Sequence, residues 1–168
     1  MEMTSKQKSV TLHDEENVKG FFGQYRFLSN FYEAEVWFEG IKYPSTENAY
    51  QAAKFSEDLR SSFVNISHSE SKNRARVLEK YIRQDWKEIK IDVMRSVLVD
   101  KFNRHLDLRE KLLNTEGKYL EETNYWDDQF WGVCNSEGEN HLGRLLMSVR
   151  DMFKHYSTKK KLKEIPLF

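Results

Sequence analysis

The clearest hydrophobic pattern in the chain predicts a long C-terminal helix. Its apolar residues recur three or four positions apart, which places them on one helical face. They are Leu142, Leu145, Leu146, Val149, Met152, Phe153 and Tyr156. A second stripe of the same period predicts another long helix in the middle of the chain, and it consists of Ile91, Met94, Leu98 and Phe102. Trp86 lies shortly before that stripe.

Shorter helices are predicted from capping residues and short apolar runs. Ser45 and Thr46 are good N-cap residues, so a helix should run over 46–55. Another should run over about 69–82, and the apolar run 108–113 predicts a third.

Aromatic and β-branched residues predict strands on either side of a tight turn. They are dense over 21–27 and 36–43, and Glu39-Gly40 has the sequence of a two-residue hairpin turn. Further short strands are expected over 119–121 and 130–134. Long helices with few strands predict an α+β fold: a mainly helical single domain with a small antiparallel sheet.

Length and composition predict one domain between two less regular ends. The chain has 168 residues, of which 39% are hydrophobic, enough for one core. The polar first residues, 1–18, are expected to form a loose arm, with at most a short strand at 10–12. The domain should cover 19–156. Residues 157–168 form a basic and apolar tail that contains Lys159, Lys160, Lys161 and Lys163.

Charge, cysteine content and apolar run length indicate which partners and which cell compartment to expect. The 27 basic and 27 acidic residues cancel, so no global field would recruit nucleic acid or membrane. Cys134 is the only cysteine, which together with the missing signal peptide predicts a cytoplasmic protein. No apolar run reaches the roughly 20 residues needed to cross a bilayer.

Several common chemistries lack their sequence signatures. The five histidines show no metal-ligand spacing, and no P-loop, GxGxxG or GxSxG motif occurs. We therefore expect neither a metal nor a cofactor. Glu47, Gln51 and Lys54 share one face of the predicted helix over 46–55, which on spacing alone is typical of a solvated polar stripe.

A second group of polar residues lies in an aromatic segment. Asp127 and Asp128 precede Phe130-Trp131-Gly132. Large flat side chains beside a carboxyl group can raise its pKa or stack on a base. The alternative is a turn in which the aspartates cap backbone groups while the aromatic residues fill the core.

The stretch 27–55, FLSNFYEAEVWFEGIKYPSTENAYQAAKF, resembles the opening motif of the NADAR family, in which an LSNF segment precedes a strand pair and a helix headed by glutamate. Further matches follow in the family's order. They are Trp86, Met94-Arg95, Lys101-Phe102, 113–117, 128–132, 140–143, Leu146-Met147 and Val149-Arg150. The resemblance covers about 22–153. It departs from the family at Asn48, often histidine in members, and at 115–117, where a threonine-glycine pair is lengthened.

The resemblance implies a YbiA-like fold and hydrolysis of N-glycosidic bonds to ribose 5-phosphate or ADP-ribose. Activities in the family include cleavage of ribosylamine intermediates of riboflavin synthesis and removal of ADP-ribose from guanine in nucleic acid. The matching positions imply a catalytic set, and it consists of Glu47, Trp86 and Asp128. They also imply substrate contacts, which are Ser29, Asn30, Lys54, Arg95, Trp131 and Asn140.

Structural roles compete with several of these assignments. Trp86 could fill the core at a helix junction, Ser29-Asn30 could be an ordinary turn, and Asn140 could cap the last helix. Two other functions stay open. One is a non-catalytic module that binds NAD or ADP-ribose, and the other is a protein that meets modified DNA or RNA through its basic tail. The sequence does not indicate an oligomeric state.

Overall fold

The computed structural model describes residues 13–163, with side chains through Ser157. Contacts divide these residues into two compact units: a central unit of residues 23–106, and a terminal unit made of 13–22 together with 107–163. The single domain expected over 19–156 stays a prediction, because contact grouping alone does not establish independent folding.

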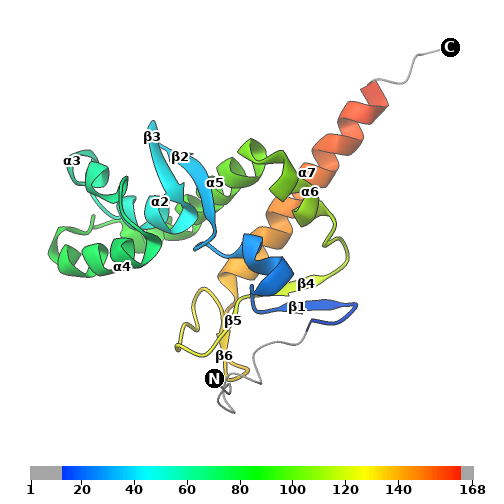
Figure 1. Cartoon of the computed structure of the whole chain (residues 1–168), viewed down its shortest axis with the longest axis horizontal. Helices are drawn as coiled ribbons and strands as arrows, with labels where there is room; N and C mark the ends of the chain where they lie inside the picture. The colour runs from blue at the N-terminus through cyan, green and yellow to red at the C-terminus, as the bar shows by residue number, and fades with distance from the viewer. Residues whose placement is uncertain (1–12, 164–168) are drawn as a thin grey trace. The chain divides into compact units, whose positions relative to one another are not determined.

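The central unit contains the predicted hairpin (Figure 1). Strand β2, Glu33–Phe38, pairs antiparallel with β3, Ile41–Ser45. Alternate residues of β2 are buried, as expected of a strand with one face on the core. Glu39 and Gly40 both have positive φ, 45° and 80°, which a two-residue hairpin turn requires. The hairpin is therefore confirmed, and its turn lies at the predicted residues.

Three helices of the central unit lie close to the predicted positions. They are α2, Thr46–Ala52; α4, His68–Val77; and α5, Trp86–Arg104. The short helix α3, Glu57–Arg60, was not predicted. Ser45 caps α2 by accepting a hydrogen bond from the Asn48 amide, and Ser67 caps α4 in a capping box with Glu70. Helix α2 packs against α4, α5 and both strands of the hairpin, so all its residues are buried.

The strand predicted over 21–27 is wrong. A 3₁₀ helix, Gly23–Leu28, occupies most of that segment, and two others span Ser61–Phe63 and Glu79–Tyr81. Phe27 and Leu28 are adjacent and both buried, whereas a strand would send neighbouring side chains to opposite faces. Aromatic content alone therefore misled the prediction.

Lys101 anchors the end of the 3₁₀ helix Gly23–Leu28 and the residue that follows it. Its side chain is fully buried, and its amine donates to the carbonyl oxygens of Phe27 at 2.7 Å and Ser29 at 3.1 Å. Burial, with a smaller effect of the Arg26 charge, lowers the pKa of Lys101 from an ordinary 10.5 to about 7. Helix α5 thus holds the 27–29 backbone through one amine.

The terminal unit combines two helices with two small parallel ladders. Helix α6 is Leu106–Leu113 and α7 is His141–Lys163. Strand β1, Asn17–Lys19, pairs with β4, Tyr119–Glu121, and β5, Thr123–Asn124, pairs with β6, Val133–Cys134. The α+β class is confirmed, although these ladders add parallel pairing to the antiparallel hairpin.

Part of the predicted loose arm is ordered. Residues 17 and 18 lie in β1, and Val18 is fully buried, so the arm over 1–18 is wrong at its described end. Its partner strand β4 lies about a hundred residues further along the chain, which local pattern reading cannot detect. The strand considered at 10–12 lies outside the described residues. At the other end, α7 continues through Lys163, into the segment expected to be a tail.

Helix α7 approaches β4 closely at Gly143. A Cβ atom on Gly143 would lie 2.1 Å from the Leu120 carbonyl oxygen, and 2.5 Å from Oδ1 of Asn140. Only glycine therefore fits at this position without displacing backbone. Within the described residues, no helix is both long and apolar enough to span a membrane.

We expect Gly143→Ala to destabilise the protein by about 1–3 kcal/mol, the usual range for overpacking. The added methyl group must push α7 away from β4. Urea unfolding of this variant should be compared with that of Arg144→Ala, which removes an exposed neighbour on the same helix and should change stability by less than about 0.5 kcal/mol. Equal midpoints for the two variants would contradict the close approach.

Lys101 predicts a particular dependence of stability on pH. The pKa of Lys101 in the folded protein, about 7, lies below the ordinary 10.5. Between pH 7 and 10.5 the unfolded chain therefore binds more protons than the folded protein. The penalty for burying the charge is complete below about 7 and fades as pH rises to 10.5. Relative to Lys101→Met, the natural protein should gain up to about 1.4 kcal/mol of stability per pH unit in this window. If the curves of unfolding free energy against pH for the natural protein and for Lys101→Met are parallel, the lowered pKa of Lys101 is refuted. The control is Lys87→Met, which alters an exposed lysine.

Candidate functional site

Glu47 lies in the first turn of α2 and is buried, with 6% of its surface exposed. Its backbone N–H donates to the carbonyl oxygen of Asn30 at 3.0 Å. Gln51, one turn later, donates from Nε2 to Oε1 of Glu47 at 2.7 Å. A carboxylate near a helix N-terminus is favoured by the helix dipole, and the amide hydrogen bond further offsets its burial. The polar stripe predicted on spacing is therefore not solvated at this point.

Trp86 and Tyr50 form an aromatic pair beside this stripe. Trp86 is the first residue of α5, and its ring centroid lies 5.1 Å from that of Tyr50 at 55°. The amine of Lys54 lies 5.5 Å from the centroid of Tyr50 and 5.9 Å from that of Trp86, within the range of cation–π attraction. Trp86 is 9% exposed, which fits a core role as well as a ligand contact.

Lys54 lies among charges of both signs. Burial is the main cause that lowers its pKa, and the Glu47 carboxylate opposes this shift. Lys72 and Lys90 add to the lowering, while Glu79 acts in the other direction. A lowered pKa increases the share of neutral amine, so this group can accept a proton or act as a nucleophile as well as bind an anion.

Ser29 and Asn30 lie on the segment held by Lys101. Both are buried, and Oγ of Ser29 accepts from the Phe31 N–H at 3.1 Å, as in a turn. Nδ2 of Asn30 contacts the sulfur of Met94 at 3.5 Å. The structure thus brings Asn30 to the start of α2, where its carbonyl receives the Glu47 N–H.

Arg95 is exposed on α5. It follows Trp86 by nine residues, about two and a half helical turns, which directs the two side chains to opposite faces. Its predicted contact with substrate stays a prediction.

Asp128 and Trp131 belong to the terminal unit. Oδ1 of Asp128 accepts from the Trp131 N–H at 2.9 Å, while its backbone N–H donates to Oδ1 of Asn124 at 3.1 Å. These are the turn contacts that the sequence offered as the alternative to catalysis. The Asp128 side chain is half-buried, so a structural contact at one oxygen does not prevent chemistry at the other. The ring of Trp131 lies edge-on to that of Phe130, at 5.0 Å and 90°.

Asn140 immediately precedes α7, and its side chain links separate backbone segments. Its Oδ1 accepts from the Glu122 N–H at 3.1 Å, and its Nδ2 donates to the Leu120 carbonyl at 2.9 Å and the Tyr119 hydroxyl at 3.0 Å. Its carbonyl accepts the first helical bond, from the Arg144 N–H. Asn140 occupies the N-cap position, but its side chain braces β4 rather than capping the helix. Its predicted contact with substrate stays a prediction.

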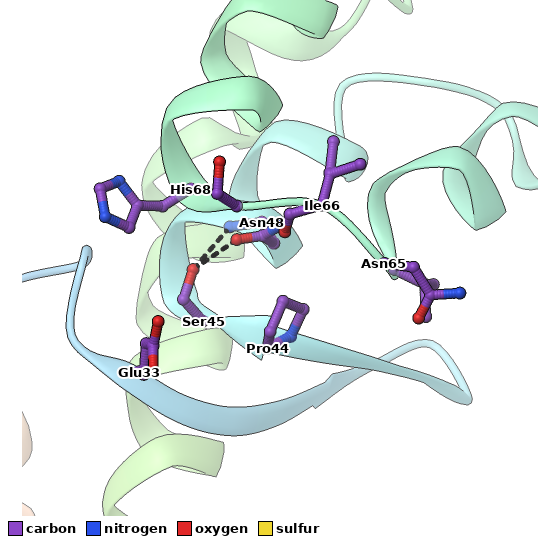
Figure 2. Close-up of a pocket in the computed structure, with 9 residues that line it drawn as sticks. Glu33, Pro44, Ser45, Asn48, Asn65, Ile66 and His68 are labelled. Atoms are coloured by element: carbon purple, nitrogen blue, oxygen red, sulfur yellow. Dashed lines mark hydrogen bonds between the residues drawn. The ribbon is translucent and has the colours of Figure 1, made fainter.

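Asn48 faces a different side of α2 from Glu47. Its Nδ2 donates to the carbonyls of Phe63 at 3.0 Å and Ile66 at 2.8 Å, and its Oδ1 accepts from Ser45. Figure 2 shows Ser45, Asn48 and Ile66 at a pocket, whose volume is about 430 Å³. No residue predicted for catalysis or substrate contact lines this pocket. Its lining residues are Glu33, Pro44, Ser45, Asn48, Val64, Asn65, Ile66, Ser67 and His68.

Sequence reasoning missed several members of the Glu47 cluster. Tyr50 and Lys90 follow the helical spacing of Glu47 and Trp86, so position on the predicted helices was an available signal. Lys72 comes from α4, and nothing in the sequence pattern places that helix beside α2. Among the described side chains, no three His, Cys, Asp or Glu residues are grouped so that they could hold a metal ion.

Comparisons with known proteins agree on one family. The model of the NADAR domain matches residues 13–154. An N-glycosidase of Nostoc punctiforme is 35% identical over 133 residues, which are 76% of this chain and 85% of that protein. A riboflavin biosynthesis protein of Vibrio vulnificus is 34% identical over 135 residues, 78% of this chain but only 36% of that longer protein.

A solved structure gives the same result for the fold. The solution structure of YbiA from Escherichia coli matches with a TM-score of 0.76 and 29% identity over 96% of each chain. The N-glycosidase YbiA of strain K12 is 35% identical over 131 residues, 76% of this chain and 81% of that protein. These findings confirm the YbiA-like fold and the predicted family. The chain belongs to the NADAR domain family.

Proposed function

We propose that this chain is a cytoplasmic enzyme that hydrolyses the N-glycosidic bond between a phosphorylated ribose and the nitrogen of a base or amine. The enzyme class, a hydrolase of N-glycosyl compounds, follows from family membership and from about 35% identity to N-glycosidases over three quarters of the chain. The ribosyl group would be ribose 5-phosphate or ADP-ribose. The relative named for riboflavin biosynthesis supports ribosylamine phosphates as one substrate class.

The observation that carries the proposal is the buried group around Glu47. A carboxylate, an amine of lowered pKa and two aromatic rings are gathered within the central unit. Burial of such groups costs stability unless they are paired, and their gathering in one place points to a function. Perturbed ionisable groups beside flat aromatic surfaces are typical of catalytic sites.

Cleavage of a ribosyl C1–N bond passes through an oxocarbenium-like state, so it needs negative charge near C1, a positioned water and a proton for the departing nitrogen. Two carboxyl groups can divide these tasks. We assign Asp128 to activating water or steadying the cation, and Glu47 to binding ribose hydroxyls or protonating the leaving group. The reverse assignment uses the same chemistry.

The remaining residues would bind the substrate. Trp86 would stack on the leaving base, a contact worth about 1–3 kcal/mol. Lys54 would anchor phosphate by charge-assisted hydrogen bonds, and the neighbouring Lys72 and Lys90 add positive charge for this purpose. Ser29, Arg95 and Trp131 are proposed as weaker contacts. A base carried by DNA or RNA would have to be single-stranded or flipped out to reach this site.

Removing either carboxylate should abolish most turnover without unfolding the chain. We expect Glu47→Gln and Asp128→Asn each to lower kcat by about 10²- to 10⁴-fold, the usual contribution of a positioned acid or base. Matched controls are Glu88→Gln and Asp127→Asn, which alter exposed carboxylates. Rates are measured with an ADP-ribosylated guanine oligonucleotide and with a ribosylamino-pyrimidine phosphate.

Unchanged rates on both substrates in both carboxylate variants would contradict the catalytic roles of Glu47 and Asp128. Tight binding of ADP-ribose by the natural protein with no base released from either substrate would instead favour the non-catalytic binding module.

Lys54 variants separate anion binding from chemistry at the amine. If the cation anchors phosphate, Lys54→Arg should keep KM within a few-fold, whereas Lys54→Met should raise KM about tenfold or more because a charge-assisted hydrogen bond is lost. The exposed Lys87→Met is the control. Equal losses of kcat in the Arg and Met variants at saturating substrate would contradict the anchoring role and assign the amine to the reaction itself.

A further inference from the structure

Three buried polar atoms without hydrogen-bond partners belong to residues that are bonded or adjacent to Glu47 in the central unit. They are Oδ1 of Asn30, Oγ1 of Thr46 and Oε1 of Gln51. The three residues are 9%, 0% and 6% exposed. Buried polar atoms in folded proteins are nearly always paired, and an unpaired one costs about 1–3 kcal/mol. Such a group beside a buried carboxylate therefore indicates a site that is completed by a ligand.

The orientation of the Gln51 amide is set by its neighbour. Because Nε2 donates to Oε1 of Glu47, the carbonyl end of the amide must point away from that oxygen. A flipped amide would place two acceptors against each other, which is unfavourable. Gln51 thus carries an unpaired acceptor, Oε1, on an amide that is held by the Glu47 carboxylate.

Asn30 presents a second acceptor from another segment. Its backbone carbonyl is bound to the Glu47 N–H, which fixes it at the start of α2. Its Nδ2 is directed at the sulfur of Met94, and this leaves Oδ1 as the unpaired atom. The Lys101 amine holds the preceding carbonyl, of Ser29, so the segment is braced on two sides.

These acceptors restrict the chemistry of the ligand group. An ionised phosphate has only acceptor oxygens and would be repelled by Glu47 and by both amide oxygens. A sugar diol has two adjacent O–H donors and no charge, which suits two uncharged acceptors on residues that are hydrogen-bonded to Glu47. The Thr46 hydroxyl can donate or accept, so it does not change this selection.

We propose that the amide oxygens of Gln51 and Asn30 accept hydrogen bonds from the 2- and 3-hydroxyl groups of the substrate's ribose. This inference rests on the proposed function and specifies its sugar. A 2-deoxy sugar leaves one buried acceptor unpaired, so the site selects ribosyl over 2-deoxyribosyl groups. Gln51 then has two roles: its Nε2 orients Glu47, and its Oε1 accepts a hydrogen bond from a ribose hydroxyl group.

The test compares binding of ribose 5-phosphate and 2-deoxyribose 5-phosphate by calorimetry, which needs no turnover. The natural protein should bind the ribose compound about ten- to a hundredfold more tightly, as expected for one or two buried hydrogen bonds. Gln51→Met keeps the side-chain length but removes the acceptor, so its preference should fall toward equality. Gln84→Met, an exposed substitution in the same unit, should keep the preference.

Asn30→Ala gives a second variant in which the preference should also fall, in case Gln51→Met does not fold. Equal affinity of the natural protein for the two sugar phosphates would overturn the inference and leave the N-glycosidase proposal standing. Failure to bind either sugar phosphate would also overturn the inference, while the turnover of the two substrates decides the N-glycosidase proposal separately. A preference for ribose that survives both substitutions would overturn the assignment to these two residues.

Discussion

The central unit is organised by the burial of a polar helix. Every residue of α2 is buried, although the helix carries Glu47, Asn48 and Gln51. Most of these polar groups find partners close by: Gln51 donates to Glu47, and Asn48 donates to the carbonyls of Phe63 and Ile66. Satisfying these groups determines how the hairpin, the 63–66 segment and the start of α2 pack.

Helix α5 supports the same arrangement from a second direction. Lys101 binds the backbone that precedes Asn30, and Asn30 in turn accepts the N–H of Glu47. At the other end of α5, Trp86 meets Tyr50 from α2. One helix thus contributes both a brace for the loop and an aromatic surface, so the candidate site rests on rigid elements rather than on loops alone.

Features that depend on neighbours in the sequence could be predicted. The hairpin follows from the Glu39-Gly40 turn, and α2 follows from Ser45 as its cap, because both signals act within a few residues. The long helices α5 and α7 follow from their apolar stripes. The family motifs supplied Glu47, Trp86 and Lys54 as candidates, and the structure brings these three side chains into one cluster.

Features that depend on distant partners could not be predicted. Strand β1 was expected to be loose because its partner, β4, is far along the chain. Gln51 was taken for a solvated residue because spacing does not report burial, and Lys101 gave no sign of its buried role. Asn140 precedes α7 as expected for a cap, but its side chain bonds to other segments.

The central claim is that the ribose end of the substrate binds beside Glu47. A crystal structure of the protein soaked with ADP-ribose tests this most directly. The account predicts that the terminal ribose lies within hydrogen-bond distance of Glu47 and Gln51, with C1 facing the carboxylate. Ribose found instead in the pocket lined by Ser45 and His68, with Gln51 contacting no ligand, would contradict it.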